Sequence, residues 1–269
     1  MLYIVATPIG NLEDITLRAL RVLKEADLIA AEDTRHTRKL LNRYEIKTKL
    51  VSFHEHSDAG KIDWLINKLV CGNDIALVSD AGTPLISDPG ARLVGKAVEN
   101  GVPVTSVPGA CAAITALAIG GITGPFCFLG FLPKKASDKS AQIKRIAESD
   151  MVCVIYESPH ALAGTLSALC DSAGAERRIV VAKELTKLHE SVFRGNLKGA
   201  QEAFKEGVKG EYVLIVDKKD EVKTMPDDES IVKEINKLLK EGMTKKDAAR
   251  AASANLGVSK NKAYSLIPE

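Results

Sequence analysis

The chain has 269 residues, of which 45% are hydrophobic and 4% aromatic, and its formal net charge is +2 at pH 7. This length suits one large domain or two ordinary ones. The longest apolar run, residues 110–122, is shorter than the ~20 residues of a membrane-spanning helix, so the sequence argues against an integral membrane protein.

Short apolar segments alternate with amphipathic segments over the first part of the chain. Alternation of this kind predicts a parallel sheet covered by helices, and we expect this N-terminal αβ domain to span residues 1–119. The expected strands are 2–6, 28–31, 50–53, 75–78 and 104–107, and the expected helices are 16–26, 34–44, 60–70 and 91–100.

A second αβ domain is expected at residues 120–218, after the glycine-rich sequence GGITGP. Ser158 and Pro159 are typical of an N-cap and a first helical position, so they predict a helix that begins there. The expected strands are 126–129, 151–156, 179–183, 191–194 and 211–216, and the expected helices are 140–148 and 159–172. The fold class is therefore α/β, with two αβ domains and a ligand cleft between them.

The last part of the chain differs in composition. Residues 219–230 are charged and broken by Pro226, which is typical of a linker. Residues 231–269 are expected to form a small helical domain, with a helix, a glycine turn and a second helix as in helix-turn-helix motifs. This basic tail either packs as a solvated hairpin or contacts RNA, in which case the candidate residues are Lys245, Lys246 and Lys260.

Both the cysteines and the N-terminus indicate a cytoplasmic protein. The five cysteines contain no CxxC pair and are odd in number, so we expect reduced thiols. The first residues, MLYIVATPIGN, lack a charged segment and predict a strand, not a signal peptide. The sequence FHEH at 53–56 offers at most two histidine ligands, so no metal site is expected.

Three turns that follow expected strands are candidates for a ligand site. The longest, SDAGTPLISDPG at 79–90, is far longer than an ordinary strand-to-helix connection. The others are ATPIGN at 6–11 and VPGACAA at 107–113, and all three end at the edge where open αβ sheets bind ligands. The chain has no GxGxxG or GxxxxGK[ST] motif, so a dinucleotide or triphosphate is not expected. The alternative is that these turns only connect and cap helices.

The sequence AEDTRHTRKLL at 31–41 combines carboxylates with basic residues at an expected helix start. Basic side chains there can hold an RNA phosphate backbone, while Asp33 or His36 can supply a base. Ordinary helix capping with a solvated basic face is the alternative. KELTKLHE at 183–190 carries alternating charge and follows an apolar strand, so it either faces solvent or lies at the ligand edge.

The motifs TPIGNL, AEDTRHT, FHEH, ALVSDAGTPLISDPG, PG-x-x-AAITAL, GFLP, YESPH, KELTK and GE-x-VLIV occur in this order. This arrangement closely resembles, over nearly the whole chain, the ribosomal RNA small subunit methyltransferase I family, which belongs to the tetrapyrrole methylase-like enzymes. The resemblance implies a homodimer that uses S-adenosylmethionine to methylate the ribose 2′-oxygen of a cytidine in the decoding region of 16S ribosomal RNA, as RNA or in the 30S subunit.

The resemblance also implies functional residues. The expected donor contacts are Pro8, Ser79, Asp80, Ala81, Gly82, Thr83, Ile86, Ser87, Gly109, Ala110, Cys111, Ala112, Phe131, Leu132, Tyr156, Leu185, Gly210 and Tyr212. The expected RNA contacts of the N-terminal domain are Arg35, Arg38 and Lys39. The candidate catalytic bases are Asp33, Glu184 and His36, and a carboxylate is favoured because Asp33 and Glu184 follow expected strands.

Two positions depart from the family pattern. The family often has PGPSA where this chain has Pro108–Ala112, and it often has arginine where this chain has Ala161, which is therefore given no role in RNA binding. A tetrapyrrole methyltransferase of the same fold and a non-catalytic RNA-binding module remain as alternatives. The basic helix start and basic tail favour RNA over a polyacidic ring.

Overall fold

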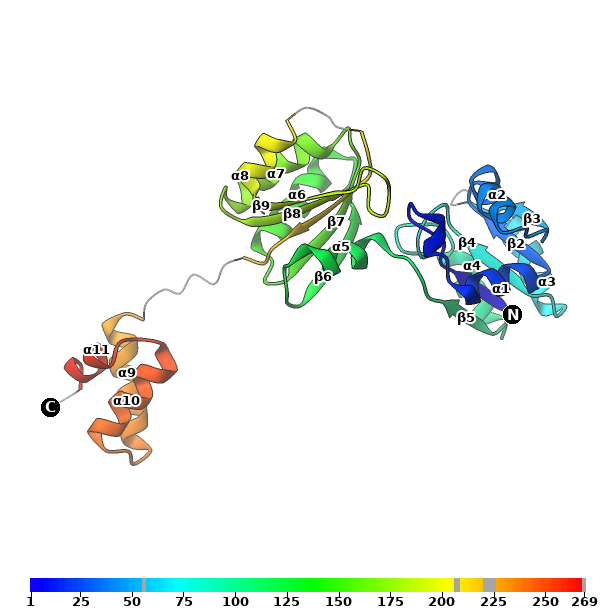
Figure 1. Ribbon diagram of the computed structural model, residues 1–269. Coiled ribbons are helices and arrows are strands. Elements are labelled where there is room, and N and C mark those ends of the chain that lie inside the picture. Colours follow the sequence, from blue (N-terminus) through cyan, green and yellow to red (C-terminus); the bar gives the residue numbers. More distant parts are fainter. Residues whose placement is uncertain (55–56, 206–208, 220–225, 268–269) are drawn as a thin grey trace. The chain divides into compact units, whose positions relative to one another are not determined.

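The computed structural model describes residues 1–54, 57–205, 209–219 and 226–267. The chain divides into two compact units, Met1–Lys219 and Asp220–Glu269. The first unit contains two sheets with their helices, and the second contains the last three helices (Figure 1). Residues 220–225 of the expected linker and 55–56 of FHEH lie outside the described residues. The expected boundary near residue 119 stays a prediction.

The N-terminal sheet is parallel, and its strand order is β3-β2-β4-β1-β5. Its strands are β1 (Leu2–Val5), β2 (Leu28–Ala31), β3 (Leu50–Ser52), β4 (Ile75–Val78) and β5 (Val104–Val107). Its helices are α1 (Leu17–Glu25), α2 (Thr34–Arg43), α3 (Ala59–Val70) and α4 (Ala91–Glu99), with a short 3₁₀ helix η1 at Leu12–Asp14. Helices α1, α2 and α3 begin at side-chain caps, which are Thr16, Asp33 and Asp58.

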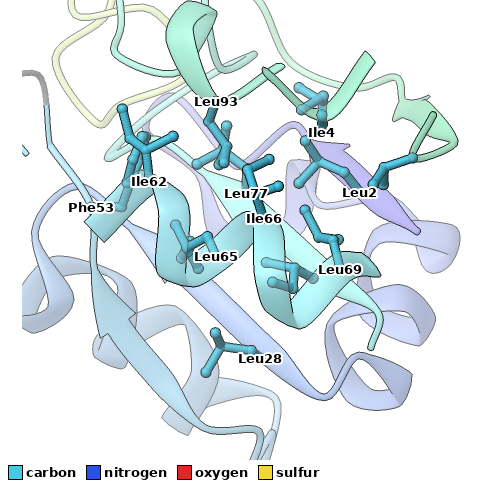
Figure 2. Close-up of a cluster of buried hydrophobic side chains, with 14 residues drawn as sticks. Leu2, Ile4, Leu28, Phe53, Ile62, Leu65, Ile66, Leu69, Leu77 and Leu93 are labelled. Atoms are coloured by element: carbon cyan, nitrogen blue, oxygen red, sulfur yellow. The ribbon is translucent and has the colours of Figure 1, made fainter. Parts of the chain in front are cut away.

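Helices cover both faces of this sheet because successive strand residues point to opposite faces and both sets are apolar. On one face, Leu2, Ile4 and Leu77 pack against α3 and α4 (Figure 2). On the other face, Val5 and Ile29 pack against the apolar stripes of α1 and α2. Helices therefore cover both faces of the sheet, so a ligand can approach it at the ends of the strands.

The chain leaves β2 and β4 in opposite directions. Strand β2 is followed by β3, its outer neighbour, whereas β4 is followed by β5, which lies beyond β1 on the other side. Diverging connections of this kind leave a crevice at the carboxyl ends of the strands, where ligands of open αβ sheets bind. The segments that begin with Glu32 and Ser79 start at this crevice.

The second sheet is mixed. Its order is β6-β7-β10-β8-β9, and only β6 and β7 among the paired described strands run parallel. Its strands are β6 (Phe126–Phe131), β7 (Val152–Glu157), β8 (Arg178–Lys183), β9 (Ser191–Asn196) and β10 (Tyr212–Val216). Helix α5 (Ala112–Gly120) packs on one face. The other face carries α6 (Ala136–Glu148), α7 (Leu162–Ala173) and α8 (Leu197–Ala203).

One expectation for this half is wrong, and one helix was not expected. Helix α7 begins at Leu162, not at Pro159, and its N-cap residue is Ala161. Ser158 contributes its carbonyl oxygen, which accepts hydrogen bonds from the N–H groups of Ala161 and Leu162 (both 3.1 Å). Helix α8 was not expected, because its seven residues carry too few apolar positions for a periodic signal.

The second unit is a three-helix domain. Its helices are α9 (Asp228–Lys240), α10 (Lys245–Leu256) and α11 (Lys260–Ser265), packed around Ile231, Ile235 and Ala252. Gly257 adopts a left-handed conformation (φ 64°) between α10 and α11, as the helix, glycine, helix pattern predicts. Within the described residues, no helix is both long and apolar enough to span a membrane.

Candidate active site

A cavity of about 400 Å³ lies where the turns of the N-terminal sheet meet the second sheet. Its N-terminal wall is the loop after β4, which includes Asp80, Gly82 and Ile86. Its opposite wall includes Tyr156 and Tyr212 from the second sheet. A cavity of this size, with apolar walls and a few polar groups, is typical of a small-ligand site.

Hydrogen bonds join the three predicted turns into one wall. The N–H of Thr7 donates to the carbonyl of Gly82 (2.8 Å), and the N–H of Gly82 donates to the carbonyl of Thr7 (3.0 Å). The Thr7 hydroxyl donates to the carbonyl of Ser79 (3.2 Å). The Thr83 hydroxyl donates to the carbonyl of Ala110 (3.0 Å). The loop at 79–90 is thus fixed at both neighbouring turns.

The loops at the cavity hold non-glycine residues in left-handed backbone conformations. These are Leu85 (φ 71°) and Ser87 (φ 69°) after β4, and Glu184 (φ 51°) and Thr186 (φ 65°) after β8. Such conformations cost about 1–3 kcal/mol each and persist only where the surroundings enforce them. Backbone strain is therefore concentrated in the two segments that flank the cavity.

Aromatic rings form part of the second wall. Tyr156 packs edge-on against Phe128 and Phe131, with ring centroids 4.9 and 5.6 Å apart. Its hydroxyl accepts a hydrogen bond from the N–H of Ala113 at the start of α5 (3.2 Å). Burial raises the pKa of Tyr156, so this phenol is neutral at physiological pH. This wall can cover a flat apolar ligand group.

Carboxylates dominate the charged part of the lining. They are Glu32, Asp80, Asp88, Glu157 and Glu211, and no lysine, arginine or histidine lines the cavity among the residues that the structure describes. Burial, followed by the charge of Glu32, raises the pKa of Asp88 to about 6. Such a lining favours a cationic ligand and disfavours a phosphate.

The chain resembles known proteins over nearly its full length. Residues 1–201 match the family described as Tetrapyrrole (Corrin/Porphyrin) Methylases. The protein of Haemophilus influenzae named "Ribosomal RNA small subunit methyltransferase I" is 45% identical over 270 residues, which cover 98% of this chain and 95% of the relative. The protein of the same name from Synechocystis is 42% identical over 277 residues, which cover 100% of this chain and 98% of the relative. The chain belongs to the ribosomal RNA small subunit methyltransferase I family.

Solved structures share the fold of this ribosomal RNA small subunit methyltransferase I family member. Uroporphyrin-III-C-methyltransferase from Thermus thermophilus superposes with a TM-score of 0.56 at 21% identity and covers 80% of this chain and 93% of its own. Diphthine synthase superposes with a TM-score of 0.61 at 15% identity, with coverages of 81% and 89%. The predicted α/β class, with two αβ domains and C-terminal helices, is confirmed. The protein is a methyltransferase, and its methyl donor is S-adenosylmethionine.

The residues of the cavity fit this donor. S-adenosylmethionine carries a positive sulfonium and a positive ammonium group, which suit the carboxylates of the lining. It has no phosphate, which agrees with the missing basic side chains in the described lining. Ile86, Phe131, Tyr156 and Leu185 give the lining an apolar part of the kind that an adenine ring requires.

The structure brings most of the expected donor contacts together. Those that line the cavity are Asp80, Ala81, Gly82, Thr83, Ile86, Ser87, Cys111, Ala112, Phe131, Tyr156, Leu185 and Tyr212. The other expected contacts, which are absent from the described lining, are Pro8, Ser79, Gly109, Ala110, Leu132 and Gly210. Several of these support the wall instead: the carbonyls of Ser79 and Ala110 accept hydrogen bonds from Thr7 and Thr83. Direct donor contact stays a prediction for all of them.

Some lining residues were not among the expected ones. They are Ile9, Glu32, Asp88, Glu157, Ser158, Pro159, Glu211 and Val213. Glu157 is buried and accepts hydrogen bonds from the N–H of Ser158 (2.8 Å) and the hydroxyl of Thr165 (2.5 Å). The sequence signal for Glu32 and Glu157 is their position, because Glu32 directly follows the apolar strand β2 and Glu157 is the last residue of β7.

None of the three candidate bases lines the cavity within the described structure. Asp33 caps α2 and pairs with Arg35 (3.0 Å). The side-chain hydrogen bond from Arg35 is the main cause that lowers the pKa of Asp33 to about 2. Burial raises the pKa of Glu184, but hydrogen bonds from Lys187 and the Glu211 N–H, together with the charges of Lys187 and Lys183, lower it below its usual value. Both carboxylates are thus weak bases in this structure, and His36 is an exposed residue of α2.

Tyr156→Phe is expected to lower the free energy of unfolding by about 1–3 kcal/mol, because the part-buried N–H of Ala113 loses its acceptor. Tyr3→Phe is the matched control, since the hydroxyl of this half-buried tyrosine makes no hydrogen bond with the described residues. Urea unfolding measures both variants. Equal free energies for the two variants would contradict a structural role for the Tyr156 hydroxyl.

Proposed function

We propose that this protein transfers the methyl group of S-adenosylmethionine to the ribose 2′-oxygen of a cytidine in the decoding region of 16S ribosomal RNA. The observation that carries this proposal is the contrast between two neighbouring surfaces at the end of β2. Glu32 lines the acidic cavity, while Arg35, three residues later, lines a basic hollow. Relatives named "Ribosomal RNA small subunit methyltransferase I" support the choice of RNA.

The basic hollow suits an RNA backbone. It has a volume of about 360 Å³ and is lined by Thr34, Arg35, Arg38, Lys39 and Asn42 of α2. The Arg35 side chain is 91% exposed. Arginine, lysine, threonine and asparagine are the side chains that commonly bind phosphate oxygens, and such contacts position the nucleic acid.

In the proposed mechanism, the charged and the apolar residues of the cavity have different roles. S-adenosylmethionine, when bound, supplies an electrophilic methyl group on a positively charged sulfur. The carboxylates favour this positive charge, while the loop after β4 and the aromatic wall exclude water and fix the geometry. The remaining task is to remove a proton from the attacking hydroxyl, which is a poor nucleophile at neutral pH.

A radiolabelled-donor assay tests this function. The purified protein is incubated with methyl-labelled S-adenosylmethionine and either 30S subunits, naked 16S RNA or uroporphyrinogen III. We expect label in RNA and none in the tetrapyrrole. Label only in the tetrapyrrole would instead support the second candidate, a tetrapyrrole methyltransferase, which the shared fold favours.

Homodimer formation and cytoplasmic action belong to the same proposal. The family resemblance supports a homodimer, and a second copy would have exposed apolar side chains such as Leu17 and Leu188 (86% and 93% exposed) available to cover. Light scattering at micromolar concentration tests this, and a monomeric mass would contradict it. Assembly of the 30S subunit takes place in the cytoplasm, where we expect the protein to act.

The tail provides a second surface for RNA in this proposal. Lys245, Lys246 and Lys260 are exposed on α10 and α11. The tail forms a compact unit of its own, so it can bind RNA without taking part in the donor cavity. Its alternative role, as a helical domain packed only on itself, has the support of its separate apolar core.

Arg35→Ala combined with Arg38→Ala is expected to weaken RNA binding about tenfold, or roughly 1.4 kcal/mol, and to leave donor affinity unchanged. The slope of log K against log salt should become smaller in magnitude by about 1.4, since each lost contact with single-stranded RNA contributes about 0.7. Filter binding at several salt concentrations measures both quantities. Lys144→Ala with Arg145→Ala on α6 is the charge-matched control, and equal losses in the two double variants would contradict a specific role for α2.

A further inference from the structure

Asp88 lines two cavities. It contributes to the acidic cavity of about 400 Å³, called the donor cavity below, and to a second cavity of about 200 Å³. The described lining of the second cavity comes from residues that follow β3, among them His54 and Ser57, and from the start of α4 with Arg92. Asp88 therefore lies at the boundary between the two cavities.

The two cavities differ in charge. The donor cavity has carboxylates and, among its described residues, no basic side chain, whereas the second cavity contains Arg92 and His54 with Asp88 as its only described carboxylate. Helix α4 begins next to this cavity, and its N-cap residue Gly90 has no side chain to occupy the first N–H groups. The second cavity thus has the charge that suits a nucleotide phosphate and ribose.

The groups around Asp88 come from several elements. Glu32 at the end of β2 and Asp80 in the same loop both repel its negative charge, while the Ser79 hydroxyl stabilises it. From the second sheet, Tyr156, Glu157 and Glu211 line the same cavity, and His54 and Arg92 face it from the second cavity. Burial, followed by the charge of Glu32, raises the pKa of Asp88 to about 6, so it is mainly a carboxylate at neutral pH and yet a stronger base than an ordinary aspartate.

We propose that Asp88 is the catalytic base of this methyltransferase and that the acceptor nucleotide reaches it through the cavity lined by His54 and Arg92. This inference rests on the proposed function, since it requires a nucleotide hydroxyl as the acceptor. Asp33 and Glu184 are held by ion pairs with Arg35 and Lys187 outside the described lining, whereas Asp88 lines the cavity proposed for the donor.

A bond forms between the ribose 2′-oxygen and the methyl carbon, and the bond between that carbon and the donor sulfur breaks with its electrons going to sulfur. The hydroxyl proton passes to the Asp88 carboxylate, which later releases it to water. The products are the 2′-O-methyl ribose and neutral-sulfur S-adenosylhomocysteine.

Single-turnover methylation of 30S subunits at saturating donor tests the base. For the wild type, we expect the rate to fall as pH falls below about 6, because Asp88 becomes protonated. Asp88→Asn should lower the rate about 10²–10⁴-fold and remove this acid limb, with donor affinity by calorimetry changed less than threefold. Asp171→Asn, at an exposed aspartate of α7, is the control and should behave as wild type.

Other outcomes decide against the proposal. An Asp88→Asn rate within threefold of wild type, or an unchanged acid limb, overturns the assignment while leaving the proposed function intact. If Asp88→Asn does not fold, Glu32→Gln is measured in its place. Because the Glu32 charge raises the pKa of Asp88, its loss should move the fall in rate to lower pH. A fall in rate at the wild-type pH overturns the assignment of Asp88 as the base. A wild type that methylates neither 30S subunits nor naked RNA overturns the proposed function and this inference with it.

Arg92→Ala tests the second cavity separately. We expect a KM for RNA at least fivefold higher, with an unchanged donor affinity and an unchanged rate at saturating RNA. An unchanged KM would overturn the route through this cavity.

Discussion

Alanine at position 10 is expected to remove most of the affinity for S-adenosylmethionine. A Cβ on Gly10 would lie 2.6 Å from the Thr186 hydroxyl oxygen and 2.8 Å from the carbonyl oxygen of Leu185. The latter contact is with backbone, so a side-chain rotation cannot relieve it. Leu185 lines the donor cavity, and the N–H of Asn11 donates to the Thr186 hydroxyl (3.0 Å). The extra methyl therefore pushes a cavity wall outward.

We expect Gly10→Ala to weaken donor binding at least tenfold, or about 1.4 kcal/mol, and to lower the free energy of unfolding by about 1–3 kcal/mol through overpacking. Calorimetry and urea unfolding measure the two quantities. Gly164→Ala in α7 is the control, because a Cβ there meets nothing within 4 Å and alanine favours a helix. Wild-type affinity in Gly10→Ala would mean that the 185–187 segment does not shape the donor site.

Removal of the Asp80 charge is expected to produce the second large loss. Its carboxylate lines the donor cavity and accepts a hydrogen bond from the part-buried N–H of Asp33 (2.9 Å). Asp80→Asn removes the charge and keeps an acceptor, while Asp80→Ala removes both. The pair of variants separates the electrostatic role from the structural role.

Both variants should bind S-adenosylmethionine about tenfold more weakly, because a carboxylate that faces the cationic donor is lost. Only Asp80→Ala should lower the free energy of unfolding by about 1–3 kcal/mol, since it leaves the Asp33 N–H without its acceptor. Calorimetry with the donor and with S-adenosylhomocysteine, whose sulfur is neutral, measures the charge effect. Equal losses for both ligands would contradict an interaction with the sulfonium.

The N-terminal half could be predicted well from its sequence. Its strands are short apolar runs and its helices have apolar stripes and side-chain caps, so local patterns alone locate β1 to β5 and α1 to α4. The order of the strands could not be predicted, because it depends on which faces pack together. The mixed pairing of the second sheet, with β10 between β7 and β8, depends in the same way on tertiary contacts.

The candidate site was predictable where it follows from local chemistry. The length, glycines and prolines of residues 79–90 indicated a ligand loop, and this loop lines the cavity. Glu32 and Asp88 were not among the expected site residues, because Glu32 resembles an ordinary polar residue after a strand and Asp88 an ordinary aspartate in a loop. Their importance arises from β2 and β4 being neighbours in the sheet, which brings the two carboxylates together although they are far apart in the sequence.

For the segment YESPH, the local sequence pattern predicted a wrong start of the helix. Ser158 and Pro159 have the local pattern of a helix start, so capping fully accounted for them in the sequence. In the structure the helix starts three residues later, and both residues line the cavity. Local propensity is overridden here because Glu157 binds the N–H of Ser158 and fixes the turn.

Mapping of ribose methylation in 16S ribosomal RNA, with and without this protein, tests the central claim most directly. RNA from cells that contain the protein should carry a 2′-O-methyl group on a cytidine of the decoding region. RNA from cells that lack it should have an unmodified ribose at that position, and the wild-type chain should restore the modification. Identical methylation maps for the two RNAs would contradict the account.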